Sequence, residues 1–346
     1  MRAIGVCYDT GFVNRGNSTH EPFETARVRE DMRVIRQDLH CRAVRITGGY
    51  PDRLKLAATE AAAADLEVWL CPFLNDVTED EVLAVVADCA EHAEQLRTSG
   101  ATIVLAVGSE LTMFVLGYLP GDTLDERSAA LRTPEGQRAV AGIPQRVNAL
   151  LARAAKIARE RFHGKLTYCS LPFENVNWDL FDILAADAGY RGSDLARDYP
   201  DTMRAWAARG EALGKPVAIT EFGCSSFRGA PDAGPHGFDI IDWDPATARP
   251  LRLNGNYERD DQAQAAHITE LLDILDAAGV DAAFCYCFAR YDLPHRENPL
   301  DDLDLASPGL VRVLDSGHGE PTTLAWQPKP AFAALAERAA RLPVSS

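Results

Sequence analysis

The chain has 346 residues, and 47% of them are hydrophobic, which is enough to fill a sizeable core. Its formal net charge of -16 gives an acidic surface that repels phosphate groups, so we expect neither nucleic acid nor an anionic membrane as a partner. No apolar run approaches the roughly 18 residues that cross a bilayer. The amino-terminal residues enter an apolar strand rather than a signal peptide, which predicts a cytoplasmic protein.

Eight short apolar stretches predict strands, at residues 3–8, 43–46, 67–72, 102–107, 166–170, 183–188, 217–220 and 282–288. Helical patterns lie between or after them, at residues 23–39, 54–64, 79–98, 142–161, 201–213, 262–278 and 331–341. This alternation predicts a parallel sheet, and eight units predict one α/β domain over residues 1–346, a (β/α)8 TIM barrel. An open doubly wound sheet is the alternative, but the turn Asp9-Thr10-Gly11-Phe12 lacks the glycine pattern of a phosphate loop.

Three connections are long for a compact domain, at residues 12–22, 111–141 and 222–257. Each follows a predicted strand, so each leaves from the carboxyl-terminal face, where barrels place their substrate clefts. We expect the second and third to fold over the barrel mouth and narrow it to a pocket. The aromatic side chains that they would bury there are Phe114, Tyr118, Phe227, Phe238 and Trp243.

Two of the predicted strands end in a glutamate. The segment Val217-Ala218-Ile219-Thr220 runs into Glu221, and an apolar strand of the same form runs into Glu110. Both carboxylates would face the same barrel mouth. Paired carboxylates are what the cleavage of a glycosidic bond requires.

With these residues in place, the chain resembles the clan A retaining glycoside hydrolases, a superfamily of (β/α)8 barrels. The resemblance implies that Glu110, ending strand four, is the acid/base and that Glu221, ending strand seven, is the nucleophile. It also implies that Arg45 and Tyr190 contact the nucleophile. Two further motifs of the family have counterparts in order along the chain, Glu258…Gln264-Ala265 and Lys329-Pro330-Ala331.

The chain departs from the family pattern at two places. Ser109 precedes the acid/base, where many members have an Asn that contacts the sugar, although Gly-Ser-Glu-Leu looks like mannan-cleaving branches. Strand eight carries no Trp, so we expect sugar stacking from Tyr286, Phe288 or the loop residue Trp243. Glu174, after strand five, is interpreted either as a ligand of sugar hydroxyls or as a solvated loop carboxylate.

The sequence therefore predicts a retaining glycoside hydrolase or transglycosidase that acts on a small glycoside or an oligosaccharide. Glu221 would stay ionised beside Arg45 and Tyr190, Glu110 would have a raised pKa, and the two carboxyl groups would lie about 5–5.5 Å apart. No cofactor and no metal are expected, and eight cysteines without a Cys-x-x-Cys pair predict buried thiols. Two alternatives stay open. One is a barrel that catalyses a non-hydrolytic isomerisation or cyclisation, and the other is a non-catalytic carbohydrate-binding or partner-binding barrel.

Overall fold

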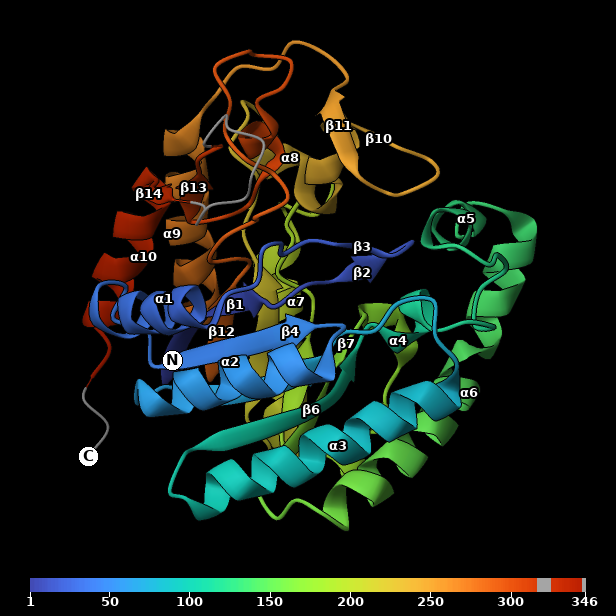
Figure 1. Ribbon diagram of the computed structural model, residues 1–346. Helices are drawn as coiled ribbons and strands as arrows, with labels where there is room; N and C mark the ends of the chain where they lie inside the picture. The colour runs from blue at the N-terminus through green and yellow to red at the C-terminus, as the bar shows by residue number, and fades with distance from the viewer. Residues whose placement is uncertain (316–324, 344–346) are drawn as a thin grey trace.

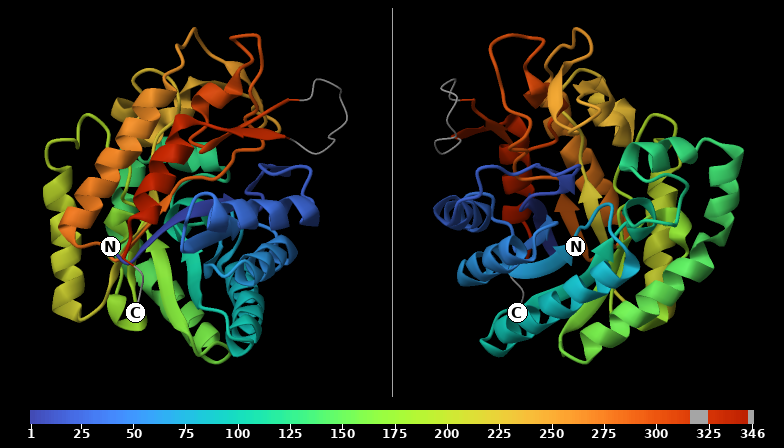
Figure 2. Two further views of the ribbon diagram at one scale, coloured as in Figure 1. Left: turned by 90° about the vertical axis from the view of Figure 1, so that its left-hand side faces the viewer. Right: turned by 45° about the vertical axis from the view of Figure 1, so that its right-hand side comes forward.

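The computed structural model describes residues 1–315 and 325–343, and its centre is a closed barrel of parallel strands (Figures 1 and 2). Around the barrel the order is β1-β12-β9-β8-β7-β6-β5-β4. The predicted (β/α)8 barrel is thus confirmed. The strands are β1 (Ala3–Asp9), β4 (Ala43–Gly48), β5 (Glu67–Pro72), β6 (Ile103–Ser109), β7 (Lys165–Ser170), β8 (Leu184–Ala186), β9 (Val217–Phe222) and β12 (Ala282–Cys285).

Helices cover the outside of the barrel. The large ones are α1 (Thr25–Gln37), α2 (Pro51–Ala63), α3 (Glu79–Thr98), α6 (Pro134–Arg159), α7 (Tyr199–Leu213), α9 (Asp261–Ala278) and α10 (Pro330–Ala340). Between β7 and β8 the structure has two 3-10 turns, Pro172–Glu174 and Trp178–Leu180, in place of an α-helix. The predicted bounds of α3 are met because a capping box closes its start, where Thr78 and Glu81 bond each other's backbone.

Small side chains and two large rings fill the barrel interior. The interior cluster contains several alanines, and among them Trp69 packs against Phe284 with ring centroids 4.8 Å apart. A separate and larger apolar layer lies between the strands and the helices, with Val68 and Leu70 of β5 among its members. Strands buried on both faces explain why the sequence shows continuous apolar runs instead of alternation.

The predicted sixth and eighth strands are longer than the observed ones. The sixth ends at Ala186, before the buried Asp187, and the eighth ends at Cys285. Beyond these points the chain turns toward the barrel mouth instead of continuing the ladder. The residues that follow, Tyr190 and Tyr286, consequently belong to the cleft described below.

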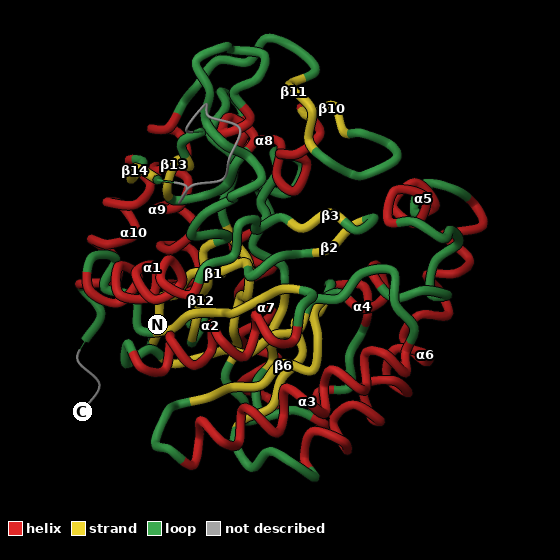
Figure 3. Tube along the Cα trace, in the orientation of Figure 1, coloured by secondary structure: helices red, strands yellow, loops and turns green. Residues whose placement is uncertain are grey.

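Short elements gather on the carboxyl-terminal side of the barrel, and the sequence patterns did not predict them. They are the hairpins β2 (Val13–Asn14)–β3 (Asn17–Ser18) and β10 (Ile241–Trp243)–β11 (Pro250–Leu253), the pair β13 (Val311–Val313)–β14 (Trp326–Pro328), and the helices α4 (Leu111–Phe114), α5 (Leu124–Ala130) and α8 (Ala230–Ala233). In Figures 1 and 3 the β2–β3 hairpin lies below the β10–β11 hairpin and extends toward the side on which α5 lies.

Candidate active site

Glu110 and Glu221 line the same cleft, which has a volume of about 1000 Å³. Glu221 belongs to β9, and Glu110 directly follows β6, so both stand at the carboxyl ends of their strands, as predicted. A second hollow, of about 680 Å³, lies at the opposite end of the barrel around Met1 and Lys215. Neither glutamate reaches that hollow, so the chemistry of the pair belongs to the carboxyl-terminal cleft.

The Glu221 carboxylate is held by two side chains, one on each oxygen. Arg45 Nη1 donates to Oε1 at 2.6 Å, and the Tyr190 hydroxyl donates to Oε2 at 2.9 Å. The predicted contacts of Arg45 and Tyr190 with Glu221 are therefore confirmed. Arg45 is fully buried on β4, and Glu221 is 7% exposed, so the ion pair is shielded from water.

A third carboxylate, Asp187, lies in the same cluster, and the sequence analysis did not assign it to the site. Ser109 donates to Asp187 Oδ2 at 2.8 Å and accepts from Arg45 Nη2 at 2.8 Å. Thr220 donates to the other Asp187 oxygen, and Arg45 lies 3.7 Å from Asp187. The residue is 5% exposed and lines the cleft. Its only sequence signal was an acid that interrupts an apolar strand pattern.

The two glutamates differ in how strongly their surroundings disfavour ionisation. Burial, followed by the charges of Asp187 and Glu221, raises the pKa of Glu110 well above its ordinary value. Burial and the charge of Asp187 also raise the pKa of Glu221, but the charge of Arg45 and the donors Arg45 and Tyr190 limit the rise to about 7. The predicted rise for Glu110 is therefore seen. Glu221, which we expected to stay ionised, also has a raised pKa, so its surroundings favour the ionised form less than we expected.

The backbone aims both glutamates at the cleft. Glu110 has φ 48° and ψ 37°, a left-handed conformation that costs about 1–3 kcal/mol for a residue with a side chain. This turn ends β6 and starts α4. Gly189 pairs with Phe222, and a Cβ at Gly189 would lie 2.1 Å from the Glu221 carbonyl oxygen. Only glycine allows this approach, which places Tyr190 beside Glu221.

Glu174 does not contact the cleft, and neither sequence interpretation of it was correct. Its side chain is fully buried and accepts hydrogen bonds from Tyr168, from Thr112 and from the Leu171 backbone. Burial raises its pKa to about 7 in spite of these donors. Glu174 is thus a structural anchor between α4 and the segment after β7.

Of the three aromatic residues expected to stack on sugar, Tyr286 lines the cleft. Phe288 does not, because it is fully buried in the outer core against Tyr8 and Trp326. Trp243 is 38% exposed on β10 and is not part of the cleft lining. The prediction of a stacking role is wrong for Phe288 and for Trp243, because the strand bends after Cys285 and the hairpin turns outward.

The two long segments that we expected over the barrel mouth both line the cleft. Phe114 and Phe238 contribute side chains to the lining, whereas Tyr118 and Phe227 are buried beneath it. Arg15, at the tip of the β2–β3 hairpin, joins these segments, because it pairs with Asp125 of α5 at 2.9 Å and also donates to the Pro245 carbonyl. The three loops therefore form one connected rim.

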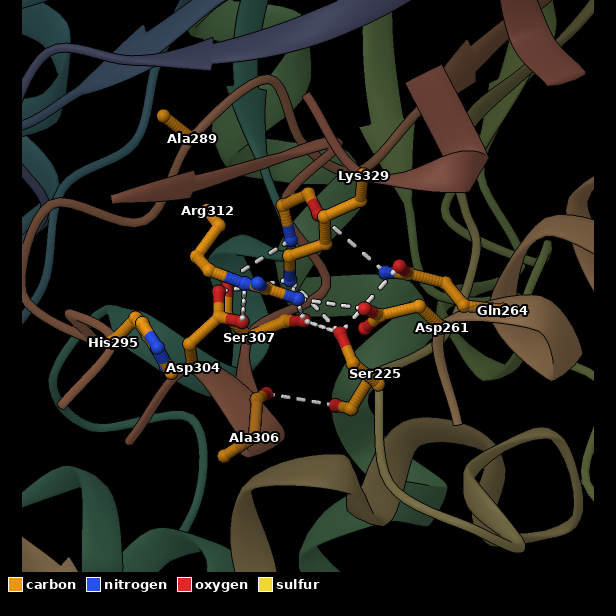
Figure 4. Close-up of polar contacts among 12 residues, drawn as sticks. Ser225, Asp261, Gln264, Ala289, His295, Asp304, Ala306, Ser307, Arg312 and Lys329 are labelled. Atoms are coloured by element: carbon orange, nitrogen blue, oxygen red, sulfur yellow. Dashed lines mark hydrogen bonds and ion pairs between the residues drawn. The ribbon is translucent and has the colours of Figure 1, made fainter. Parts of the chain in front are cut away.

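A buried polar cluster supports the loop after β9 from behind (Figure 4). Lys329 and Asp304 form an ion pair at 2.9 Å with side chains 0% and 1% exposed. Lys329 also donates to Ser226 Oγ at 2.8 Å, and Gln264 donates to the Cys224 carbonyl at 3.0 Å. Cys224 lines the cleft. The motifs around Gln264 and Lys329 therefore fasten the loop that follows the Glu221 strand.

Apolar side chains make up most of the cleft lining. Within residues 1–315 and 325–343, no group of three or more His, Cys, Asp or Glu side chains could hold a metal ion. All eight cysteines are free and buried, as expected. In the same described ranges, no helix is both long enough and apolar enough to cross a membrane.

No protein-family model matches the chain, and no curated protein matches it. Among solved structures it matches a GH113 β-1,4-mannanase with a TM-score of 0.59 and 15% identity, over 99% of this chain and 100% of that chain. The GH113 β-mannanase from Alicyclobacillus acidocaldarius gives a TM-score of 0.61 and 16% identity over 99% of each chain. A GH5_18 structure from Streptomyces cattleya, in complex with Manβ1-4GlcNAc, gives 0.56 and 14%, over 100% of this chain and 82% of that chain.

The chain therefore has the barrel fold of GH113 and GH5 structures, which is the fold that the clan A resemblance implied. At these identities the matches show a shared fold only. The chemistry of the site is therefore inferred from the residues that line the cleft.

Proposed function

We propose that this protein is a retaining glycoside hydrolase or transglycosidase. The observation that carries the proposal is the pair of strand-end glutamates in one cleft, with Glu221 held by Arg45 and Tyr190 and Glu110 half-buried near other carboxylates. A nucleophile needs a partly ionised carboxylate, and a general acid needs one that keeps its proton. The surroundings of Glu221 favour its ionised form more than those of Glu110 do, as these two roles require.

In the proposed mechanism, Glu221 attacks the anomeric carbon while Glu110 gives its proton to the oxygen of the leaving group. The bond from the anomeric carbon to that oxygen breaks, and a covalent glycosyl-enzyme forms. Glu110, now ionised, takes a proton from water or from an acceptor alcohol, which displaces Glu221 and releases the sugar with retained configuration. This sequence requires carboxyl groups about 5–5.5 Å apart.

Asp187 supports the same chemistry. Its charge disfavours ionisation of both glutamates, which helps Glu110 to keep the proton that a general acid needs. Ser109, which stands where many clan A members have Asn, bonds Arg45 and Asp187.

The proposed substrate is a small glycoside or an oligosaccharide, and no cofactor takes part. The cleft of about 1000 Å³ and its connected rim support a compact ligand. The double displacement needs no metal ion because an acid and a nucleophile suffice for it.

The test is a panel of 4-nitrophenyl glycosides in both anomeric forms. We expect release of nitrophenol from at least one member, with the first product formed in the configuration of the substrate when followed by NMR. Glu221→Gln should abolish this activity. The control Glu258→Gln, at an exposed carboxylate that pairs with Arg228, should keep it. Inverted configuration, or activity that survives Glu221→Gln, would contradict the proposal.

The apolar lining supports a second candidate function, the isomerisation or cyclisation of an apolar substrate by Glu110 as a general acid. This candidate predicts that no glycoside of the panel is cleaved. The non-catalytic alternative would need a glutamate displaced from the barrel mouth, and both glutamates line the cleft.

A further inference from the structure

The side of the cleft beside Glu110 is an apolar wall built from three separate segments: α4, the stretch around α5, and residues 171–173. In the part of the chain that the structure describes, these segments line the cleft with apolar side chains and with Ser128 and Arg132, which are both exposed at its edge. The apolar members, called here the apolar wall, are Met113, Phe114, Leu124, Leu131, Leu171 and Phe173.

The wall starts one turn from Glu110. Helix α4 begins at Leu111, and the backbone N–H groups of Met113 and Phe114 point back to the Glu110 carbonyl at 2.9 Å and 3.4 Å. Met113 and Phe114 are half-buried, and Phe173 is 36% exposed. Apolar surface is therefore open to a ligand directly beside the proposed acid.

Buried polar groups hold the wall in place. Glu174 accepts from Thr112 of α4 and from the Leu171 backbone, which joins two of the three segments. Arg127 of α5 is fully buried and donates to the Met113 carbonyl at 2.7 Å, which joins the third. Arg127 also pairs with Asp76. Apolar side chains fixed in this way form a preformed surface for a ligand.

An aromatic contact closes the end of the wall. The Phe73 and Phe114 rings meet edge to face, with centroids 4.7 Å apart and an interplanar angle of 86°. Both residues line the cleft. Phe12 packs against each ring from behind. A ligand that extends from Glu110 along the wall thus meets aromatic and aliphatic surface throughout.

Building on the proposed function, we propose that the preferred substrates are glycosides whose leaving group is apolar, such as an alkyl chain or a fused hydrocarbon ring system. In the double displacement, Glu110 protonates the leaving oxygen, so the leaving group lies on the Glu110 side, against the wall. A second sugar there would lose water from its hydroxyl groups and find few polar partners. A hydrocarbon would instead bury apolar surface.

The experiment uses methyl, butyl, hexyl and octyl glycosides of the sugar that the nitrophenyl panel selects, together with the disaccharide of the same sugar. Alkyl alcohols differ little in acidity, so the series changes apolar area alone. Full burial of one methylene group is worth about fourfold in binding. Half-burial of the four groups that separate butyl from octyl predicts a rise in kcat/KM of roughly 15-fold. The disaccharide should be cleaved less efficiently than the octyl glycoside.

Two variants locate the effect. Leu131→Asn and Phe173→Ser should reduce the ratio of octyl to methyl kcat/KM about fivefold, because each removes apolar surface that only the longer chain reaches. Phe173 is partly exposed, so its replacement does not endanger the fold. The matched control is Leu251→Asn, a leucine that is 52% exposed on β11 and does not line the cleft. It should leave the ratio unchanged.

Each outcome bears on a different claim. The preference for an apolar leaving group is wrong if kcat/KM does not rise along the alkyl series while hydrolysis still depends on Glu221. It is also wrong if the disaccharide is cleaved faster than the octyl glycoside. In both cases the assignment as a glycosidase stands. Equal ratios in the wall variants and in Leu251→Asn would overturn the assignment to the wall. Failure of every glycoside to react would overturn the proposed function itself, and with it this inference.

Discussion

Arg45→Met removes the cation that partners the Glu221 carboxylate and replaces it with an apolar side chain of similar length. Arg45 is fully buried, donates to Glu221 at 2.6 Å and lies 3.7 Å from Asp187. The variant therefore leaves two carboxylates in the barrel mouth without their cation. Breaking a buried ion pair on one side costs about 3–5 kcal/mol of folding free energy.

The same change should move the pH dependence of activity. The pKa of Glu221 is about 7 with Arg45 in place, and an adjacent cation lowers a carboxyl pKa by about 1–3 units. Without the cation, the ionised fraction of Glu221 at pH 7 falls from half to about 10% or less. Loss of ionised nucleophile alone should then reduce kcat/KM at pH 7 by at least about fivefold, and activity should return in part as the pH rises.

The assay is kcat/KM on the best nitrophenyl glycoside from pH 5 to 10. Its acid limb reports the Glu221 pKa in the free enzyme and should rise by about 1–3 pH units in Arg45→Met. Arg127→Met is the matched control, because it removes another fully buried guanidinium, one that pairs with Asp76. The control should lose stability without moving the acid limb. An unmoved acid limb in Arg45→Met would refute the electrostatic account of Glu221.

Stability should change with pH in a defined direction. Glu221 has a folded-state pKa above its unfolded value, so its ionisation costs stability above about pH 7, and the cost disappears as protonation proceeds below that pH. Arg45→Met enlarges this cost. Chemical unfolding should show a larger deficit relative to wild type at pH 8.5 than at pH 5.5. A deficit independent of pH would indicate lost packing instead of lost charge balance.

Three further predictions concern other contacts of the site. Asp187→Asn removes the charge that disfavours ionisation of Glu221, so the acid limb of kcat/KM should move to lower pH, and a shift upward would contradict this. Tyr190→Phe removes a hydrogen bond of 2.9 Å to the nucleophile, and a bond to a charged group is worth about 1.5–3 kcal/mol, so kcat/KM should fall about 10- to 150-fold with little change in the unfolding midpoint. Lys329→Met removes the ion pair of 2.9 Å with Asp304, which still pairs with Arg259 at 2.7 Å, so the loss of one charged hydrogen-bond partner should cost about 1.5–3 kcal/mol in chemical unfolding, measured against the half-buried control Lys55→Met.

The barrel could be predicted from the sequence because the patterns that indicate it lie within single short segments. Strands buried on both faces must be apolar at nearly every position, as at Val217, Ala218 and Ile219, and these runs alternate with helical patterns. The bounds of β5 and α3 agree with those predicted. The sixth and eighth strands were extended too far, since Asp187 and Tyr286 continue an extended pattern but face the cleft.

The pair of strand-end glutamates could also be predicted, because each one directly follows or ends an apolar strand and therefore stands at the barrel mouth. The contacts of Arg45 and Tyr190 with Glu221 came from the resemblance, and the structure places them within hydrogen-bonding distance. The role of Glu174 could not be predicted. A loop carboxylate looks the same in sequence whether it faces water or is buried under four donors.

The sequence by itself determined the periodicity, the strand ends and hence the face on which the two glutamates stand. Only the tertiary structure decided which groups surround them. Asp187 meets Ser109 and Arg45 across 78 and 142 residues of chain, and the apolar wall brings α4, α5 and residues 171–173 together. The physical reason is that apolar periodicity records how one segment meets the core, whereas burial, charge and the shape of a cleft depend on which distant segments become neighbours.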